Sequence, residues 1–282
     1  MLRERIQEYL RELRALGRSP YTVVNYEKHL AKFASFCEEN GIDFRQVNGK
    51  ESRAFRNRLV EEGLAPKTVN TILGAVRSFY DFLCETGEVK GNPWIMRRLR
   101  VKEERRQPDF LTEAELEKVM AAVQRLPYHV GLAFRVMLAA GLRVSEAASL
   151  SPEDVRLVEG ERVFLRVRHG KGGKERQAPV TDPGVAKEIL AVARERAGLP
   201  SLFGISAGTL KVYAHQIKKE TGISFHCHRL RHTLATRLLN QGFPIDVVQK
   251  VLGHADISTT RRYAETLPEA VLRVAAKVAE RG

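Results

Sequence analysis

A run of charged residues between positions 97 and 107 breaks the helical pattern of the sequence and most constrains how the chain can fold. The run reads RRLRVKEERRQ and has almost no apolar periodicity, which is typical of a segment between two domains. Directly after it, Thr112 and Glu115 have the spacing of a capping box, so a helix is expected to begin there. We therefore predict a helical domain over residues 1–96, a linker over 97–108 and a second domain over 109–282. A chain of 282 residues is long enough for each domain to bury its own core.

Helical periodicity accounts for the first domain. Apolar residues recur every three or four positions, Gly17 and Gly63 end two of the runs, and Ser19 followed by Pro20 is typical of a helix start. A fourth helix is expected to begin at Pro66. Its polar side is a candidate DNA-facing surface, although a plain solvated face would have the same pattern; the residues on that side are Lys67, Asn70, Thr71 and Arg77.

The second domain is expected to be mainly helical with one small hairpin. Val163, Leu165 and Val167 alternate as in a strand, residues 170–173 are rich in glycine, and residues 178–180 return, which would place Lys171 at the tip. The predicted fold class is therefore mainly α with a small β-sheet or hairpin in the second domain.

Several helices are expected to follow the hairpin. Ser206 is expected to cap one whose polar side offers a second set of candidate DNA contacts, Lys211, His215 and Lys218. Another is expected over about residues 228–241, and the next begins at Pro244 and is closed by Gly253. A helix containing Tyr263 and an amphipathic last helix over about residues 268–280 complete the domain.

The charge of the chain favours a polyanionic partner. The formal net charge is +13 and the pI is about 9.9, and both the first 107 residues and the remainder are basic. Neutralising phosphates supplies most of the non-specific affinity for nucleic acid, although charge alone fits a merely basic soluble protein equally well.

The cysteines and the apolar runs indicate which cellular compartment the protein is expected in. Three scattered cysteines suit a reducing compartment better than a disulfide framework, and no CxxC pair indicates zinc. The N-terminus has no apolar segment like that of a signal peptide. The most apolar run, residues 130–142, is short and broken by Arg135, so we expect a cytoplasmic protein without a membrane span.

Four separated motifs contain the residues that breaking a phosphodiester without a metal would require. Two arginines, Arg143 and Arg231, can hold the non-bridging oxygens of a phosphate as its charge develops. Lys171 can protonate the leaving 5′ oxygen, and His228 and His254 can donate hydrogen bonds or move protons. Tyr263 is the candidate nucleophile, with its deprotonation favoured by the surrounding cations.

One further residue has a supporting role in this hypothesis. Glu146 follows Arg143 by one helical turn and could orient its guanidinium.

Each motif taken alone has a plainer interpretation. Arg143 could belong to a structural ion pair, and Tyr263 could be an ordinary core or surface aromatic. The glycine-rich turn around Lys171 lacks the spacing and the Ser/Thr of a Walker A motif, so nucleotide binding is not expected. A zinc site built from His226, Cys227, His228 and His232 lacks a second ligand cluster, so neither a metal nor another cofactor is expected.

In combination the motifs identify a resemblance. The sequences GLRVSE at 141–146, GKGGKER at 170–176, HRLRH at 228–232 and LGHADISTTRRY at 252–263 occur in this order. With them the chain resembles the tyrosine recombinases of the phage integrase family, and most closely the compact Xer-type members. The resemblance runs over nearly the whole chain, including the amino-terminal pattern from Ser19 to Phe33, and no catalytic position is missing.

The resemblance implies a function and an assembly. It implies a two-domain C-shaped clamp on double-stranded DNA, a covalent 3′-phosphotyrosyl intermediate, and strand exchange through a Holliday junction that resolves chromosome or plasmid dimers. It also implies four protomers, identical or including a related recombinase, with the last helix docking in trans, and a DNA translocase as a possible regulator. A type IB topoisomerase and a non-enzymatic helix-turn-helix regulator are the alternatives; the chain length and the LGH motif disfavour the first, and the second leaves the catalytic set unexplained.

Overall fold

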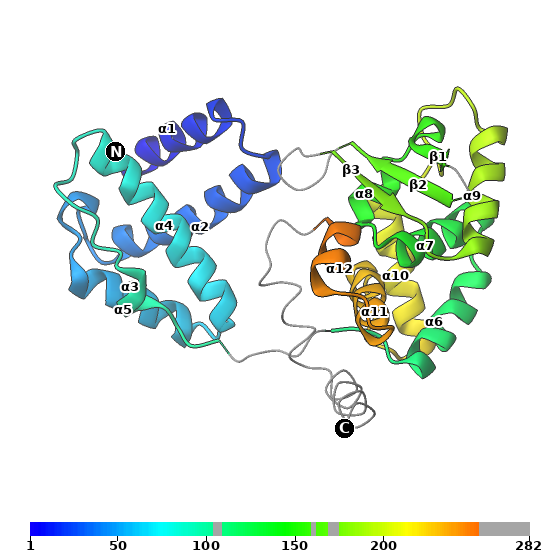
Figure 1. Ribbon diagram of the computed structural model, residues 1–282. Helices are drawn as coiled ribbons and strands as arrows, with labels where there is room; N and C mark the ends of the chain where they lie inside the picture. The colour runs from blue at the N-terminus through cyan, green and yellow to red at the C-terminus, as the bar shows by residue number, and fades with distance from the viewer. Residues whose placement is uncertain (104–108, 159–161, 169–174, 254–282) are drawn as a thin grey trace, which may run out of the picture. The chain divides into compact units, whose positions relative to one another are not determined.

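A computed structural model of the chain describes residues 1–103, 109–158, 162–168 and 175–253. The chain divides into two compact units, Met1–Arg105 and Arg106–Gly282, each with its own hydrophobic core (Figure 1). A short helix, α5 (Met96–Leu99), lies at the start of the segment expected to be a linker. Leu99 on this helix is buried in the core of the first unit, so this part of the expected linker packs against the helices of that unit.

The first unit is helical throughout. Ser19 caps the second helix by accepting a hydrogen bond from the backbone N–H of Thr22, with Pro20 as the first helical residue. The elements are α1 (Leu2–Ala15), α2 (Pro20–Glu39), the 3-10 turn η1 (Phe44–Gln46), α3 (Gly49–Glu61), α4 (Pro66–Glu85) and α5.

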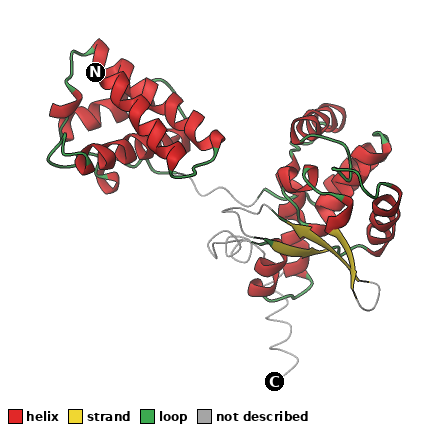
Figure 2. Ribbon diagram, turned by 90° about the horizontal axis from the view of Figure 1, so that it is seen from above, coloured by secondary structure: helices red, strands yellow, loops and turns green. Residues whose placement is uncertain are grey.

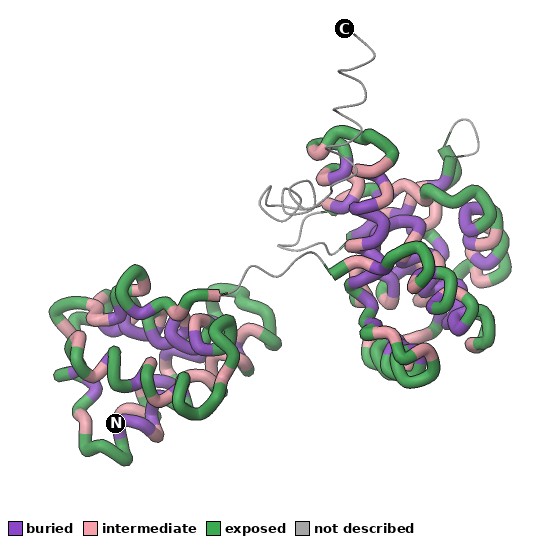
Figure 3. The backbone as a smooth tube through the Cα atoms, turned by 90° about the horizontal axis from the view of Figure 1, so that it is seen from below, coloured by how far each residue is buried: buried purple, intermediate pink, exposed green. Residues whose placement is uncertain are grey.

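An aromatic cluster fills the centre of the first unit. The indole of Trp94 contacts the rings of Phe33 and Phe55 edge to face, with centroids 5.3 and 5.8 Å away, an arrangement that adds to the free energy gained from burial. The helices of this unit have buried and exposed stretches, as the burial colouring shows (Figure 3), and the buried side chains are mainly apolar.

The second unit begins with helices and contains one sheet. Thr112 and Glu115 form the expected capping box at the start of α6, since each side chain accepts a hydrogen bond from the other residue's backbone N–H. The elements are α6 (Glu113–Gln124), α7 (Tyr128–Ala140), α8 (Val144–Ala148), the 3-10 turn η2 (Pro152–Asp154), β1 (Val155–Val158), β2 (Arg162–Val167), β3 (Arg176–Pro179), α9 (Pro183–Glu195), α10 (Ala207–Thr221), α11 (Cys227–Asn240) and α12 (Ile245–Leu252).

The sheet is antiparallel, with strand order β1-β2-β3 (Figure 2). The β2–β3 pair is the hairpin expected from the sequence, with Val167 opposite Arg176 and Leu165 opposite Ala178. The sequence did not indicate β1, because this edge strand buries none of its residues fully and so has no alternation of apolar and polar positions. The fold is nevertheless mainly α with a small sheet, as predicted.

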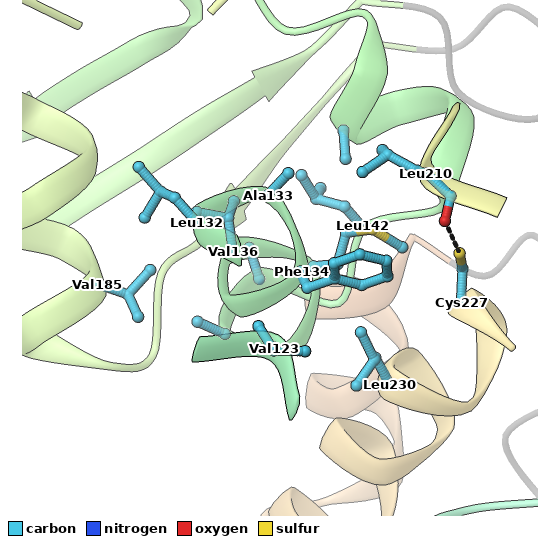
Figure 4. Close-up of a cluster of buried hydrophobic side chains, with 14 of the residues drawn as sticks. Val123, Leu132, Ala133, Phe134, Val136, Leu142, Val185, Leu210, Cys227 and Leu230 are labelled. Carbon is cyan, nitrogen blue, oxygen red and sulfur yellow. Dashed lines mark hydrogen bonds between the residues drawn. The ribbon is translucent and has the colours of Figure 1, made fainter. Parts of the chain in front are cut away.

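Helix α7 forms the centre of the second core. Leu132, Ala133, Phe134 and Val136 on this helix are buried among residues of the surrounding helices, including Leu210 of α10 and Leu230 of α11 (Figure 4). The thiol of Cys227 is directed at the backbone oxygen of Leu210, 3.9 Å away. The core therefore fixes α10 and the start of α11 against α7.

Helix α12 is held by a smaller apolar cluster of its own. Leu234 and Leu238 of α11 pack against Val248 and Leu252 of α12, so α12 lies beside α11 (Figure 1). No helix in the described part of the chain is long and apolar enough to cross a membrane.

Candidate active site

The turn after α7 places Arg143 at the start of α8. Gly141 has a φ of +62°, a left-handed conformation that ends α7 and that favours glycine. A Cβ on Gly141 would lie 2.5 Å from Cδ2 of Leu252, so α12 packs directly against the backbone of this turn. Arg143 is the N-cap residue of α8, and its side chain is 24 % exposed. Its guanidinium is therefore held by the fold while part of it reaches solvent.

Glu146 is the anionic centre of the site. Its side chain is 2 % exposed and accepts four hydrogen bonds. Two come from the backbone N–H and the Nη1 of Arg143, at 2.8 and 2.6 Å, and two from the Nη1 and Nη2 of Arg176, both at 2.8 Å. Burial alone would raise the pKa of Glu146, but the hydrogen bonds from Arg176 and Arg143 outweigh it and lower the pKa to about 2. The carboxylate is thus ionised at neutral pH, and its bond to Arg143 is the one predicted from the sequence.

Arg231 joins three of the sequence motifs. Its side chain is almost completely buried, and its Nη1 donates to the backbone oxygen of Gly141 at 2.6 Å and its Nη2 to that of Leu252 at 2.5 Å. Burial, and the nearby charges of Arg143 and Arg176, lower the pKa of Arg231 to about 9. The guanidinium therefore stays charged at neutral pH. The two carbonyls that it binds belong to Gly141 and Leu252, which precede Arg143 and His254 by two residues in the sequence.

Arg176 on β3 contacts the end of α12. Gly253 closes α12 with a φ of +65°, and a Cβ on it would lie 2.2 Å from Cδ and 2.5 Å from Nε of Arg176. The Arg176 side chain therefore lies directly on the backbone that precedes His254, which gives a physical reason for glycine in the LGH motif.

Arg176 is the last residue of the GKGGKER motif, and the sequence pattern alone predicts no role for it. Strand alternation could have indicated that Arg176 points inward. Arg176 and Ala178 are two residues apart and so lie on the same face of β3, and Ala178 is buried. An inward arginine requires an anionic or carbonyl partner.

His228 lies at the start of α11 and is exposed. Partial burial of the ring lowers the pKa of His228, and the charges of Arg231 and Arg143 lower it further. The imidazole is therefore neutral at pH 7. Its ring meets that of His232 edge to face, 4.3 Å between centroids. His228 and Arg231 therefore both lie near the N-terminal end of α11, but only the histidine is exposed.

Three predicted catalytic residues lie outside the described residues. Lys171 falls in the segment 169–174, and His254 and Tyr263 fall after residue 253. The last expected helix, over residues 268–280, falls there too. Their roles stay predictions.

Two of the residues considered as zinc ligands, His226 and Cys227, have other surroundings. The Nε2 of His226 lies 3.0 Å from a carboxylate oxygen of Asp109, and the Cys227 thiol is buried with a pKa raised to about 11 by that burial. Within the described ranges, no group of three or more His, Cys, Asp or Glu residues could hold a metal.

The candidate DNA contacts on α10 lie beside His228. Lys211, His215 and Lys218 are exposed, and Ser206 caps this helix as expected, accepting from the N–H of Thr209 at 3.0 Å. The three side chains line a groove of about 440 Å³ together with Val144, Ala214, Ser224, Phe225, His226, Cys227 and His228. A cationic helix face therefore adjoins the starts of α8 and α11.

The candidates on α4 have mixed surroundings. Lys67, Thr71 and Arg77 are exposed, and the Thr71 hydroxyl donates to the backbone oxygen of Lys67. Asn70 is half-buried, and its side-chain amide bonds to both the N–H and the C=O of Val101. In this structure Asn70 holds the segment after α5 against α4, a structural role that the sequence pattern did not indicate.

Comparison with known families matches both units. The family described as "Phage integrase family" matches residues 109–269, and the family described as "Phage integrase, N-terminal SAM-like domain" matches residues 6–87. The tyrosine recombinase XerC of Bacillus subtilis (strain 168) is 33 % identical over 276 residues, which cover 89 % of this chain and 88 % of that protein. The tyrosine recombinase XerA of Pyrococcus furiosus is 30 % identical over 285 residues, covering 96 % and 93 %.

Solved structures share the fold. XerH site-specific recombinase bound to a palindromic difH substrate matches with a TM-score of 0.75 and 21 % identity, over 98 % of this chain and 84 % of that one. A lambda integrase (75-356) dimer bound to a COC' core site matches with a TM-score of 0.74 and 21 % identity, over 93 % and 94 %. A lambda integrase tetramer bound to a Holliday junction matches with a TM-score of 0.71 and 24 % identity, over 90 % and 77 %.

Proposed function

This chain belongs to the phage integrase family of tyrosine recombinases, enzymes that transfer DNA strands, and from that premise we propose that Tyr263 is the nucleophile of a site-specific recombination reaction. In this reaction the phenolic oxygen bonds to phosphorus, the bond from phosphorus to the 5′ oxygen breaks, and a 3′-phosphotyrosyl link stores the energy for rejoining. The biological outcome we propose is resolution of chromosome or plasmid dimers.

The convergence of three motifs on Arg231 is the observation that carries this proposal. Its two Nη groups bond to the backbone oxygens of Gly141 and Leu252, so the segments that contain Arg143 and precede His254 are fixed around one buried cation. A rigid array of positive charge is what a phosphorus centre needs as its oxygens become more electron-rich.

The exposures of the two arginines suggest different roles. Arg143 is 24 % exposed and can donate to a non-bridging phosphate oxygen. Arg231 is 1 % exposed and donates to two carbonyls, so it also supplies a fixed positive charge near Arg143 and holds the site together, beside the phosphate contact predicted for it from the sequence. Glu146 orients Arg143, because its carboxylate accepts hydrogen bonds from both the backbone N–H and the guanidinium of Arg143.

Proton transfers fall to the remaining residues. A neutral His228 can accept a proton or donate a hydrogen bond at the phosphate. We assign protonation of the 5′ oxygen to Lys171 and a second hydrogen bond to the phosphate to His254. Neither assignment needs a metal or another cofactor.

The partner is double-stranded DNA. The groove that joins Lys211, His215 and Lys218 to His228 provides a path for a phosphate backbone toward the site. We propose that both units contact the duplex and that four protomers, identical or paired with a related recombinase, exchange strands through a Holliday junction. The last helix would dock in trans, a translocase could regulate the assembly, and the reaction would take place in the cytoplasm.

A Tyr263→Phe variant tests the nucleophile. We expect it to footprint the target site as the wild type does while strand exchange is lost, because the phenol that forms the covalent link is gone and the binding surface is intact. Unchanged recombination would rule Tyr263 out as the nucleophile.

Plasmid relaxation and trapping of a covalent adduct separate the alternative functions. A type IB topoisomerase would relax supercoiled plasmid lacking any recombination site and exchange no partners. A non-enzymatic regulator would bind its site and form no covalent adduct in either the wild type or the variant.

A further inference from the structure

Arg176 holds Glu146 with a geometry that differs from every other ion pair of the site. Its two Nη groups each donate to a separate carboxylate oxygen at 2.8 Å, which is the bidentate fork available to arginine but not to lysine. Its side chain is only 13 % exposed. The contact spans 30 residues of sequence and connects β3 to α8.

The same side chain also supports the end of α12. With no Cβ on Gly253, the Cδ and Nε of Arg176 lie directly against the backbone, and the preceding carbonyl, that of Leu252, accepts from Arg231. Arg176 therefore touches both the carboxylate that orients Arg143 and the peptide that leads into His254. Arg176 is also paired with Val167 in the sheet, so the strand pairing fixes the position of its Cα.

Charge balance indicates what this side chain contributes. Among the described residues, the cations that act on Glu146 or on Arg231 are Arg143 at the start of α8 and Arg176 on β3. His228 on α11 is acted on by Arg231, His226 and Arg143. If Glu146 were paired with Arg143 alone, one anion would cancel the one cation that faces solvent. With Arg176 bound as well, the carboxylate is shared between two cations, and Arg143 keeps a larger part of its field for a phosphate.

We propose that Arg176 is a positioning residue for strand cleavage, which aligns Arg143 through Glu146 and seats the backbone in front of His254. This inference rests on the proposed function. It assigns Arg176 no contact with DNA, so its loss should affect the rate of cleavage much more than the affinity for the target site.

The test compares Arg176→Gln with Arg166→Gln in the full-length protein. Arg166 is a matched control, because it lies on β2 and pairs with buried Asp154 at 3.1 Å but has no contact with Glu146. Cleavage is measured in a single turnover on a nicked duplex, and affinity by mobility shift. Loss of residues that orient a site residue typically lowers activity about 10- to 100-fold, so we expect a loss of this size for Arg176→Gln with less than about a 3-fold change in affinity.

Two further measurements separate positioning from folding and from the proposed function. Arg176→Lys keeps the charge and loses the fork, and we expect it to restore part of the cleavage rate. Carbon-13 labelling of glutamate carboxyls follows Glu146 in the absence of DNA, with Glu146→Gln as the assignment control. Arg176→Gln should make Glu146 titrate at higher pH, and Arg166→Gln should leave it unchanged.

The outcomes are distinguishable. If the wild type forms no adduct, the proposed function fails, and the Glu146 titration still decides whether Arg176 governs this carboxylate. If Arg176→Gln and Arg166→Gln have equal cleavage rates, or if the titration of Glu146 does not move in Arg176→Gln, the inference is overturned.

Discussion

Replacing Gly253 by alanine tests the close packing at the centre of the site. The substitution has two costs. A residue with a Cβ in the left-handed conformation loses about 1–2 kcal/mol, and φ at Gly253 is +65°. The new Cβ would also lie 2.2 Å from Cδ of Arg176. Because both ends of the Arg176 fork are bound to Glu146, the side chain cannot move aside freely, and overpacking of this kind costs about 1–3 kcal/mol.

Gly222 is the matched control for this experiment. It closes α10 with a φ of +69°, and a Cβ there would meet nothing within 4 Å. Gly222→Ala should therefore lose only the conformational part, about 1–2 kcal/mol, whereas Gly253→Ala should lose about 2–5 kcal/mol in total.

Calorimetry of the full chain measures the difference. For a domain of this size each kcal/mol lowers the melting temperature by about 2–4 °C. Trp94 is the only tryptophan in the sequence and lies in the first unit, so its fluorescence follows the unfolding of that unit, while calorimetry follows the whole chain. Equal destabilisation by the two alanines would refute the contact between Arg176 and Gly253.

Three further predictions concern stability. Folding holds the pKa of Glu146 at about 2, below its ordinary value near 4.5, so the ionised form stabilises the fold above pH 4.5 by about 3 kcal/mol, and this stabilisation is lost as the pH falls toward 2. The difference in free energy of unfolding between wild type and Glu146→Gln should accordingly narrow from pH 5 to 3 in urea titrations, and a constant difference would contradict the ionised state assigned to Glu146. Thr233→Val removes the acceptor of the Leu111 N–H and should cost about 1–3 kcal/mol in thermal melts; a neutral effect would argue against that bond. Ser206→Ala removes the cap of α10 and should lower the free energy of unfolding by about 1 kcal/mol, measured in thermal melts; an unchanged melting temperature would argue against that cap.

Local chemistry made most helix starts predictable from the sequence. Ser19, Thr112 and Ser206 each accept the backbone hydrogen bond expected of a capping residue, because a cap depends on residues only two or three positions away. The apolar face of α4 and the alternation in β2 were predictable for the same reason.

Contacts between distant segments were not predictable in this way. The pairing of Arg176 with Glu146 and the bonds from Asn70 to Val101 each join residues about 30 positions apart, and no local pattern specifies them. β1 was missed because its residues are mostly exposed. The order of the motifs predicted the candidate site, whereas the need for glycine at positions 141 and 253 depends on α12 packing against the turn after α7 and against Arg176 of β3.

The proposed reaction depends on attack by Tyr263 on phosphorus next to the charges around Arg231. The most direct measurement is to incubate the full-length protein with a nicked cognate duplex, isolate any covalent adduct under denaturing conditions, and identify the modified peptide by mass spectrometry. We expect an adduct in which the nucleotide is attached to Tyr263. No adduct, or attachment to any other residue, would contradict it.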